Sequence, residues 1–163
     1  MTRTSTVKIH QEEIAFSAGH FTIFSATERE DLHGHNYYVS MAIDAVLPDT
    51  GLSFDYRIYK SILLDLAKEL DRKFLLPSQS EFLKIEDKDD MWFAHFNKER
   101  IPFLKRDALI LPISNVTIEE LSHWFLQHVV KDKTLLEKHQ IYGITINVYN
   151  GPGQSGSARW EKN

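Results

Sequence analysis

The feature that most constrains the fold is the stretch of residues 33–47, in which apolar side chains occupy every second position. Side chains two residues apart point to the same side of a β-strand. The odd positions that follow the two histidines of this stretch are all apolar: Tyr37, Val39, Met41, Ile43, Ala45 and Leu47. The pattern therefore predicts one long strand with a buried odd face, and it places His33 and His35 at the end of that face.

A third histidine is in phase with a second predicted strand. The even positions Ile14, Phe16 and Ala18 are apolar and lead to His20. The 12 residues between His20 and His33 suit an irregular loop between adjacent antiparallel strands. Buried neutral imidazoles need a partner for their lone pairs, and three protein ligands with one open position are typical of catalytic zinc. The pattern thus predicts a Zn²⁺ site; the alternative is ordinary histidines of the core or surface.

Composition narrows the class of protein. A chain of 163 residues with 42% hydrophobic and 12% aromatic residues predicts a single domain, residues 1–163, with a proper core. The net charge of −4 and the lack of a basic stripe disfavour nucleic-acid binding. There is no cysteine, which excludes disulfides, thiolate ligands and a cysteine nucleophile. With no visible signal peptide or membrane span, we expect a cytoplasmic protein that does not bind membranes.

The remaining segments predict two helices and two further strands. Apolar side chains change phase between Ile9 and Ile14, which predicts a β-bulge within residues 10–13. Asp55 is the expected N-cap of a helix that ends near Leu70. Residues 117–120 have the capping-box pattern that begins a second helix. Residues 141–150 and 155–160 are the expected third and fourth core strands.

Residues 77–112 are expected to be an insertion into this core. Residues 82–85 and 91–96 look like strands joined by an acidic turn, which predicts a protruding hairpin. The order of elements therefore favours an α+β domain: a four-stranded antiparallel sheet with two helices on one face, and an inserted hairpin.

Several of these segments resemble the 6-pyruvoyl-tetrahydropterin synthase family, which includes the 6-carboxy-tetrahydropterin synthases of queuosine synthesis. They are residues 16–20, the His-Gly-His-Asn-Tyr run at 33–37, and residues 51–55, 70–71 and 117–119. The similarity covers most of the chain except residues 77–112. It implies the tunnelling fold, self-association into a trimeric barrel that can stack into a hexamer, and a catalytic zinc held by His20, His33 and His35.

The resemblance also implies catalytic residues, and here the chain departs from the family. Family members use a cysteine in the loop before the His-Gly-His run, and Arg29 occupies the best-matching position. Arginine stays protonated and cannot act as a general base. Glu30 is the nearest substitute, and the alternative is that it belongs to a solvated acidic loop. Asp71 matches a family aspartate, but Arg72 replaces the histidine that should follow it.

The same comparison suggests contacts with the substrate. Arg72 would bind a phosphate or carboxylate group, or would instead stabilise the end of the first helix. Asn150 takes the place of a glutamate that holds the pterin ring, unless it is only a turn residue. Thr117 and Glu119 match a pair that helps to bind the ring, unless Thr117 only caps its helix.

The predicted function is a zinc-dependent lyase that acts on dihydroneopterin triphosphate or a related pterin-like heterocycle. A retro-aldol reaction on dihydroneopterin, with Glu30 as the base, is a close variant. The departures from the family motivate a different class of function, a zinc-containing module that binds its ligand without turnover. A purely structural zinc is the third reading of the same histidines.

Overall fold

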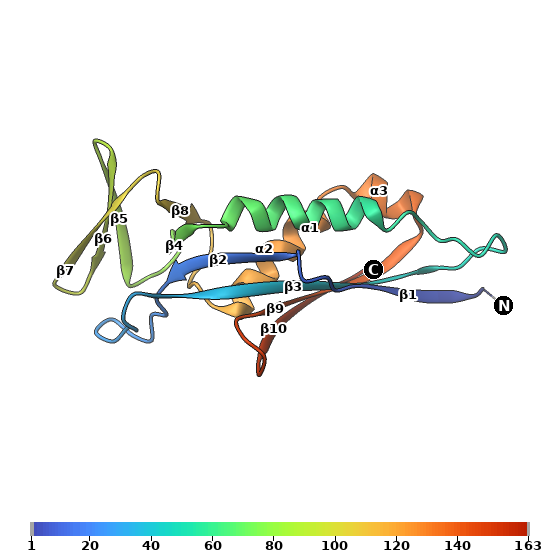
Figure 1. The fold of residues 1–163 in the computed structure, drawn as a ribbon, viewed down its shortest axis with the longest axis horizontal. Helices are drawn as coiled ribbons and strands as arrows, with labels where there is room; N and C mark the ends of the chain where they lie inside the picture. Colours follow the sequence, from blue (N-terminus) through green and yellow to red (C-terminus); the bar gives the residue numbers. More distant parts are fainter. Residues whose placement is uncertain (1, 163) are drawn as a thin grey trace.

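The computed structural model describes residues 2–162, and its elements follow a simple order along the chain. Two short strands precede a long one; one helix, five short strands and two further helices follow before a final hairpin (Figure 1). The elements are β1 (Thr4–Ile9), β2 (Ala15–His20), β3 (His33–Val46), α1 (Arg57–Leu70), β4 (Lys73–Pro77), β5 (Leu83–Lys88), β6 (Met91–Phe96), β7 (Glu99–Leu104), β8 (Ala108–Leu111), α2 (Ile118–Val129), α3 (Lys133–Lys138), β9 (Ile141–Tyr149) and β10 (Ser155–Glu161).

The main sheet confirms the α+β class, and it has more strands than the four that were expected. Its order is β10-β9-β3-β2-β4-β8, and β1 also pairs with β3, which makes seven strands. The expected strands form its antiparallel part, whereas β4 and β8 extend it in parallel pairings. β4 could not be recognised from alternation because its last three residues are all buried. It approaches β2 closely at Gly19, where any Cβ would collide with the Phe74 ring.

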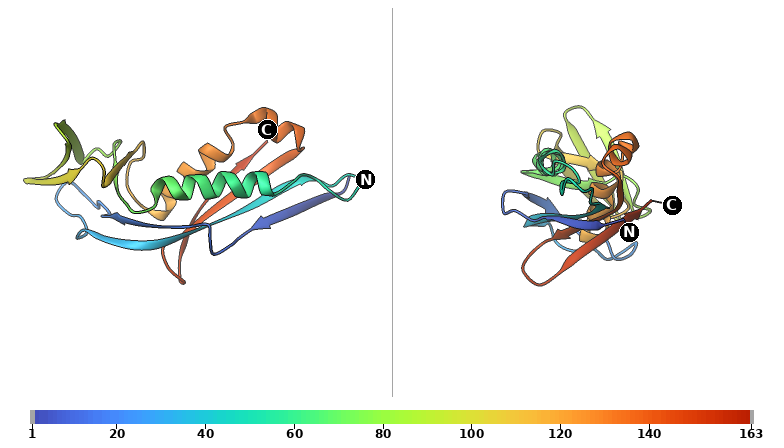
Figure 2. Two further views of the ribbon diagram at one scale, coloured as in Figure 1. Left: turned by 45° about the horizontal axis from the view of Figure 1, so that its top comes forward. Right: turned by 90° about the vertical axis from the view of Figure 1, so that its right-hand side faces the viewer.

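The two predicted helices cover one face of this sheet (Figure 2). α1 buries Tyr59, Leu63 and Leu66 against the apolar face of the strands. The expectation that Asp55 is its N-cap is wrong, because the helix begins later and Tyr56 is the N-cap residue. The Asp55 carboxylate instead accepts hydrogen bonds from the Arg57 backbone N–H (3.0 Å) and from the guanidinium of the same residue.

The change of phase before β2 is larger than the predicted bulge. Ile9 pairs with Met41 and Ala15 pairs with Tyr38, so residues 10–14 face only residues 39–40. The chain makes a turn here, and β1 and β2 are separate strands on the same side of β3. Both Ile9 and Ile14 are still buried, which is what the apolar pattern requires.

Residues 77–112 contain the predicted hairpin as β5 and β6, and a third strand, β7, extends it to a three-stranded antiparallel sheet. This small sheet lies at one end of the elongated molecule (Figure 1). It packs on a second apolar cluster around Phe21, Ile23 and Leu76, next to the loop that follows β2. β8 then rejoins the main sheet. In the described part of the chain, no helix is long and apolar enough to cross a membrane.

Candidate metal centre

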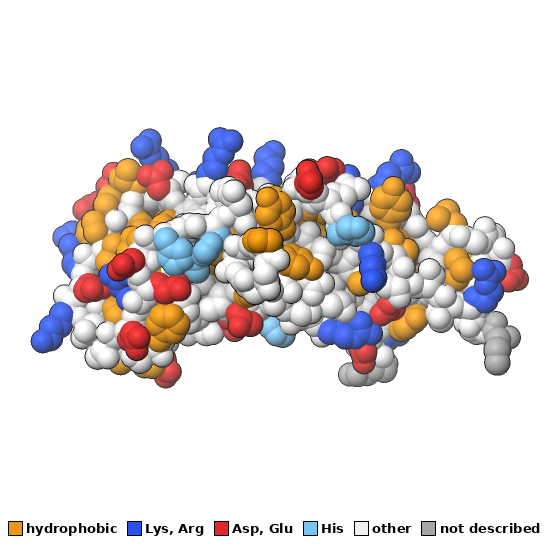
Figure 3. All heavy atoms as spheres, turned by 60° about the horizontal axis from the view of Figure 1, so that its bottom comes forward, with side chains coloured by type: hydrophobic (Ala, Val, Ile, Leu, Met, Phe, Trp, Pro, Cys, Tyr) orange, Lys and Arg blue, Asp and Glu red, His pale blue; other side chains and the backbone are white. Residues whose placement is uncertain are grey.

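Three histidines meet where β2 and β3 end. The strands pair in register, so that His20 lies opposite His33 and Ala18 lies opposite His35. One nitrogen from each ring lies within 4.8 Å of one nitrogen from each of the others. The structure thus brings the three predicted side chains together. Figure 3 shows histidine side chains gathered at the surface towards the end of the molecule that carries the small sheet, with acidic side chains beside them.

Backbone carbonyls determine which nitrogen faces the centre in two of the three rings. The Nδ1 atom of His20 lies 2.8 Å from the carbonyl oxygen of Val116, and Nδ1 of His33 lies 2.7 Å from that of Asp31. A carbonyl oxygen only accepts, so both Nδ1 atoms carry the proton. The Nε2 atom of each of these two rings then has a free lone pair, and that of His20 is buried without a hydrogen-bond partner among residues 2–162.

The arrangement of these lone pairs fits a bound cation. Nε2 of His33 lies 3.1 Å from Nε2 of His35, a distance at which two lone pairs repel each other unless a proton or metal ion lies between them. A histidine that ligates a metal usually donates its other N–H to a carbonyl or carboxylate, as His20 and His33 do here. Three imidazoles with no thiolate and an orphaned buried nitrogen are a donor set that suits Zn²⁺.

Burial and neighbouring charges lower the pKa of two of the rings, which favours the neutral form that binds a metal. Burial lowers the pKa of His20, and the neighbouring His33 and His35 lower it further, against the opposing effect of the hydrogen bond to Val116. Burial and His33 likewise lower the pKa of His35. Because a metal binds neutral imidazole, these shifts favour metal binding at neutral pH.

Glu30 places a carboxylate next to the histidines. Its Oε2 atom lies 3.8 Å from Nε2 of His33 and accepts a hydrogen bond of 2.9 Å from the backbone N–H of Thr22. Burial raises the pKa of Glu30, but the hydrogen bonds from Thr22 and the attraction of His33 and His20 outweigh it, so the pKa is lowered. The group is therefore an ionised proton acceptor at neutral pH.

The start of α2 adjoins the histidines, because the Val116 carbonyl that holds His20 directly precedes the N-cap Thr117. The Thr117 hydroxyl accepts a hydrogen bond from the Glu120 N–H (3.3 Å), as the capping box predicts. Glu119 lies exposed in the first turn of the helix. These two predicted substrate contacts are thus near the triad, although Thr117 is engaged in capping.

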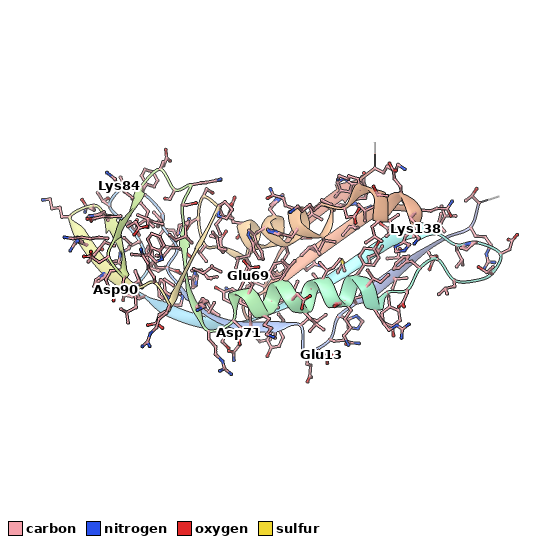
Figure 4. All side chains as sticks on the ribbon, turned by 90° about the horizontal axis from the view of Figure 1, so that it is seen from above. Glu13, Glu69, Asp71, Lys84, Asp90 and Lys138 are labelled. Atoms are coloured by element: carbon pink, nitrogen blue, oxygen red, sulfur yellow. The ribbon has the colours of Figure 1, made fainter. Side chains whose placement is uncertain are left out.

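Asp71 and Arg72 lie elsewhere in this chain. Asp71 follows the C-terminal end of α1 (Figure 4), where its carboxylate accepts a hydrogen bond from the Ser17 N–H (2.8 Å) and the Arg72 N–H donates to the Ser17 carbonyl (2.7 Å). The Arg72 side chain is 90% exposed. Among the described residues, neither Asp71 nor Arg72 forms a hydrogen bond, ion pair or ring contact with the three histidines, because the β2 backbone holds both of them.

Asn150 lies just after β9, in the turn to β10. Its amide oxygen accepts a hydrogen bond of 2.6 Å from the Gln154 side chain. This contact agrees with the alternative that it is a turn residue.

Sequence reasoning missed two residues of this region: Tyr37, which contacts the triad, and Arg29, which contacts Glu30. The ring of Tyr37 meets those of His20 and His35 edge-on, and its hydroxyl is buried without a partner. Burial raises the pKa of Tyr37, so it keeps its proton. Its position two residues after His35 was the available signal. The family resemblance indicates only that Arg29 replaces a cysteine, whereas in the structure its side chain donates a hydrogen bond to the Glu30 carbonyl oxygen (2.7 Å).

The fold and the site together define a class: an α+β protein with a three-histidine centre that can bind a divalent metal ion, and with a carboxylate beside it. The comparison with known families gives a more specific result. Residues 8–160 match the family model described as 6-pyruvoyl tetrahydropterin synthase, and the chain belongs to this family.

Relatives and solved structures agree with this membership. The chain is 30% identical over 149 residues to the provisionally named 6-carboxy-5,6,7,8-tetrahydropterin synthase of Methanocaldococcus jannaschii. The matched region covers 90% of each of the two proteins. It matches the 6-pyruvoyl tetrahydropterin synthase structure from Plasmodium falciparum with a TM-score of 0.92 and 28% identity, over 98% of this chain and 99% of that one. The match to the Plasmodium vivax structure has a TM-score of 0.93 and 26% identity, with the same coverage. These matches span residues 77–112, which the sequence motifs did not include.

Proposed function

We propose that this protein is a zinc-dependent lyase that acts on dihydroneopterin triphosphate or a related pterin-like heterocycle with a hydroxylated side chain. The observation that carries the proposal is the convergence of His20, His33 and His35 around the buried, unpartnered Nε2 of His20. Membership of the 6-pyruvoyl tetrahydropterin synthase family supports the type of reaction and the class of substrate.

In this proposal His20, His33 and His35 hold the zinc ion. When bound, zinc acts as a Lewis acid that polarises oxygen atoms of the substrate. The chain supplies the rest: the carbonyls of Val116 and Asp31 fix the orientation of two rings. Metal binding thus depends on backbone groups at the start of α2 and in the loop before β3.

Glu30 is the proposed general base. Its carboxylate is ionised, lies 3.8 Å from His33 and is oriented by the Thr22 N–H. It would accept a proton from the substrate side chain as a C–O or C–C bond breaks. The proposed base has the same residue type as one named for a relative: two further Plasmodium vivax structures each carry a substitution of a glutamate that is described there as a catalytic residue.

The start of α2 is the proposed site of ring recognition, with Thr117 and Glu119 as contacts. Asn150 would be a further contact; its oxygen accepts from Gln154, which leaves its NH₂ group to donate to a ring acceptor. Asp71 and Arg72 would contact the substrate from another copy of the chain.

We propose self-association as a trimer or hexamer, because β10 ends the main sheet with an open edge that pairing between copies would satisfy. Light scattering would give three or six times the 19.0 kDa of one chain, and a monomer at all concentrations would contradict it.

A second candidate function is a module that binds its ligand without turnover. The observation in its favour is the lack of any cysteine, together with the placement of Asp71 and Arg72 away from the triad. A retro-aldol reaction on dihydroneopterin remains within the first proposal, since it uses the same base and metal.

The test is product analysis by mass spectrometry after the zinc-loaded protein is mixed with dihydroneopterin or its triphosphate. We expect turnover of one of them, its loss in His35→Ala, and a decrease of about 100-fold or more in kcat in Glu30→Gln, the usual contribution of a general base. His123→Ala and Glu28→Gln are matched controls at exposed positions and should keep full activity. Tight binding without turnover would favour the second candidate, and neither binding nor turnover would refute both.

A further inference from the structure

The Arg29 side chain connects the loop that carries Glu30 with the small three-stranded sheet. Its Nη2 and Nε atoms lie 2.6 Å and 2.7 Å from the same carboxylate oxygen of Glu99, the first residue of β7. Its Nη1 atom donates a hydrogen bond of 2.7 Å to the Glu30 carbonyl oxygen. One guanidinium group therefore contacts both the backbone of the proposed base and a carboxylate 70 residues further along the chain.

Aromatic rings hold this guanidinium in place. Its central carbon lies 5.2 Å from the ring centre of Phe21 and 5.9 Å from that of Phe96. Both rings are buried in the apolar cluster that joins the small sheet to the loop. A guanidinium that stacks on aromatic faces and binds a carboxylate is preorganised, and the Arg29 side chain is only 15% exposed. This pair is thus better ordered than an ordinary surface ion pair.

The loop backbone transmits this anchoring to the Glu30 carboxylate. Ile23 and Arg29 form an antiparallel bridge. The Glu30 N–H donates to the Thr22 carbonyl, and the Thr22 N–H donates to the Glu30 carboxylate, both at 2.9 Å. Arg29 contacts the small sheet and Glu30 approaches His33 (3.8 Å). A shift of Arg29 would therefore shift the carboxylate relative to the histidines.

We propose that Arg29 is a positioning residue, and that the small sheet, through Glu99, fixes the distance between the Glu30 carboxylate and the metal centre. This inference rests on the proposed function, in which Glu30 is the base. It assigns residues 77–112 a role in the reaction although, in the described part of the chain, their side chains form no hydrogen bond, ion pair or ring contact with the three histidines. Arg29 and Glu99 act through Glu30 and do not touch the reacting atoms.

The first test is kinetic and uses a matched pair of variants. Glu99→Ala removes the anchor, whereas Asp87→Ala removes an exposed ion pair with Lys105 in the same small sheet. We expect Glu99→Ala to lower kcat about 10- to 100-fold with little change in KM, because a small misplacement of a catalytic group has effects of this size. Asp87→Ala should keep the kcat of the unaltered protein. Arg29→Lys, which retains the charge but loses the forked geometry, should resemble Glu99→Ala.

A double-mutant comparison separates positioning from a general structural effect. If Glu99 acts through Glu30, Glu99→Ala has no further effect on kcat in a Glu30→Gln background. An equal loss of kcat in both backgrounds, or a change in KM alone, would overturn the positioning role.

The second test needs no turnover. Amide hydrogen exchange of residues 21–32 should become at least about 10-fold faster in Glu99→Ala than in Asp87→Ala, since the loop opens more readily once its anchor is lost. Unchanged exchange in an active enzyme overturns the positioning role alone. If the unaltered protein turns over neither pterin, the proposed function fails, and the positioning role in catalysis fails with it.

Discussion

At the scale of the residue, His20 explains most of the candidate site. It is 4% exposed, and one of its ring nitrogens is held by a carbonyl while the other has no partner. A buried polar atom without a hydrogen bond costs about 1–3 kcal/mol. A metal ion between the three rings would remove that cost, so the same feature that destabilises the metal-free protein favours binding.

A second buried polar group gives a prediction for pH. The Tyr59 hydroxyl lies within hydrogen-bond distance of Nδ1 of His139 (2.8 Å), and burial, with the Asp132 charge, raises the pKa of Tyr59 from 10.0 to about 12. Above pH 10 the Tyr59 hydroxyl loses its proton in the unfolded chain but keeps it in the folded chain. The contribution of this group to the free energy of unfolding is therefore fully present below pH 10 and is lost as the pH rises to about 12. We expect a loss of about 1.4 kcal/mol between pH 8 and 11.

The measurement is urea unfolding across this range, compared with Tyr59→Phe. Tyr59→Phe should not show this decrease of about 1.4 kcal/mol in the free energy of unfolding at alkaline pH. If both proteins lose the same free energy of unfolding between pH 8 and 11, the pKa of Tyr59 is not raised in the folded state.

The sequence was informative about single residues where a local pattern determines their direction. Alternation in two strands predicted that His20, His33 and His35 share one face, and the structure brings them together. The sequence could not predict the contact between Arg29 and Glu99, because no local pattern relates residues that are 70 positions apart. Asp71 matches a family motif, yet its carboxylate accepts a hydrogen bond from the Ser17 N–H and not from a histidine of the triad.

At the scale of the element, the start of α2 joins the helix layer to the metal centre. Thr117 caps the helix, and the preceding carbonyl of Val116 orients His20. The backbone of Ile118 also lies against Gly156 of β10, where a Cβ would collide with it. The position of this helix end is thus fixed from two sides.

The cap can be tested by substitution. Thr117→Ala removes the hydrogen bond to the Glu120 N–H and should lower the free energy of unfolding by about 1 kcal/mol. Thr117→Ser keeps the capping oxygen and should retain most of that stability. Urea unfolding measures both, and equal destabilisation by the two variants would show that the methyl group matters and the cap does not.

Elements with strong periodicity were predictable and short buried ones were not. The long strand β3 and the helices α1 and α2 follow from alternation and from one apolar face. β4 and β8 have five and four residues and belong to the parallel part of the sheet; parallel strands lack alternation because both their faces tend to be buried. β7 contains Pro102, a residue that argues against a strand except at an edge, and β7 is indeed an edge strand.

At the scale of the whole molecule, the main sheet carries the helices on one side, and the small sheet extends the fold at one end (Figures 1 and 2). The triad lies where these two parts approach each other, since His20 is followed at once by Phe21 of the second apolar cluster. The small sheet is therefore in a position to support the site.

X-ray anomalous scattering at the zinc edge, from crystals of the protein grown with zinc, tests directly whether the three histidines bind this metal. We expect one zinc ion per chain, bound by nitrogen atoms of His20, His33 and His35 at about 2.0–2.1 Å, and its loss in His35→Ala but not in His123→Ala. Density that shows the three rings without an ion, or a zinc ion bound elsewhere in the chain, would contradict this expectation.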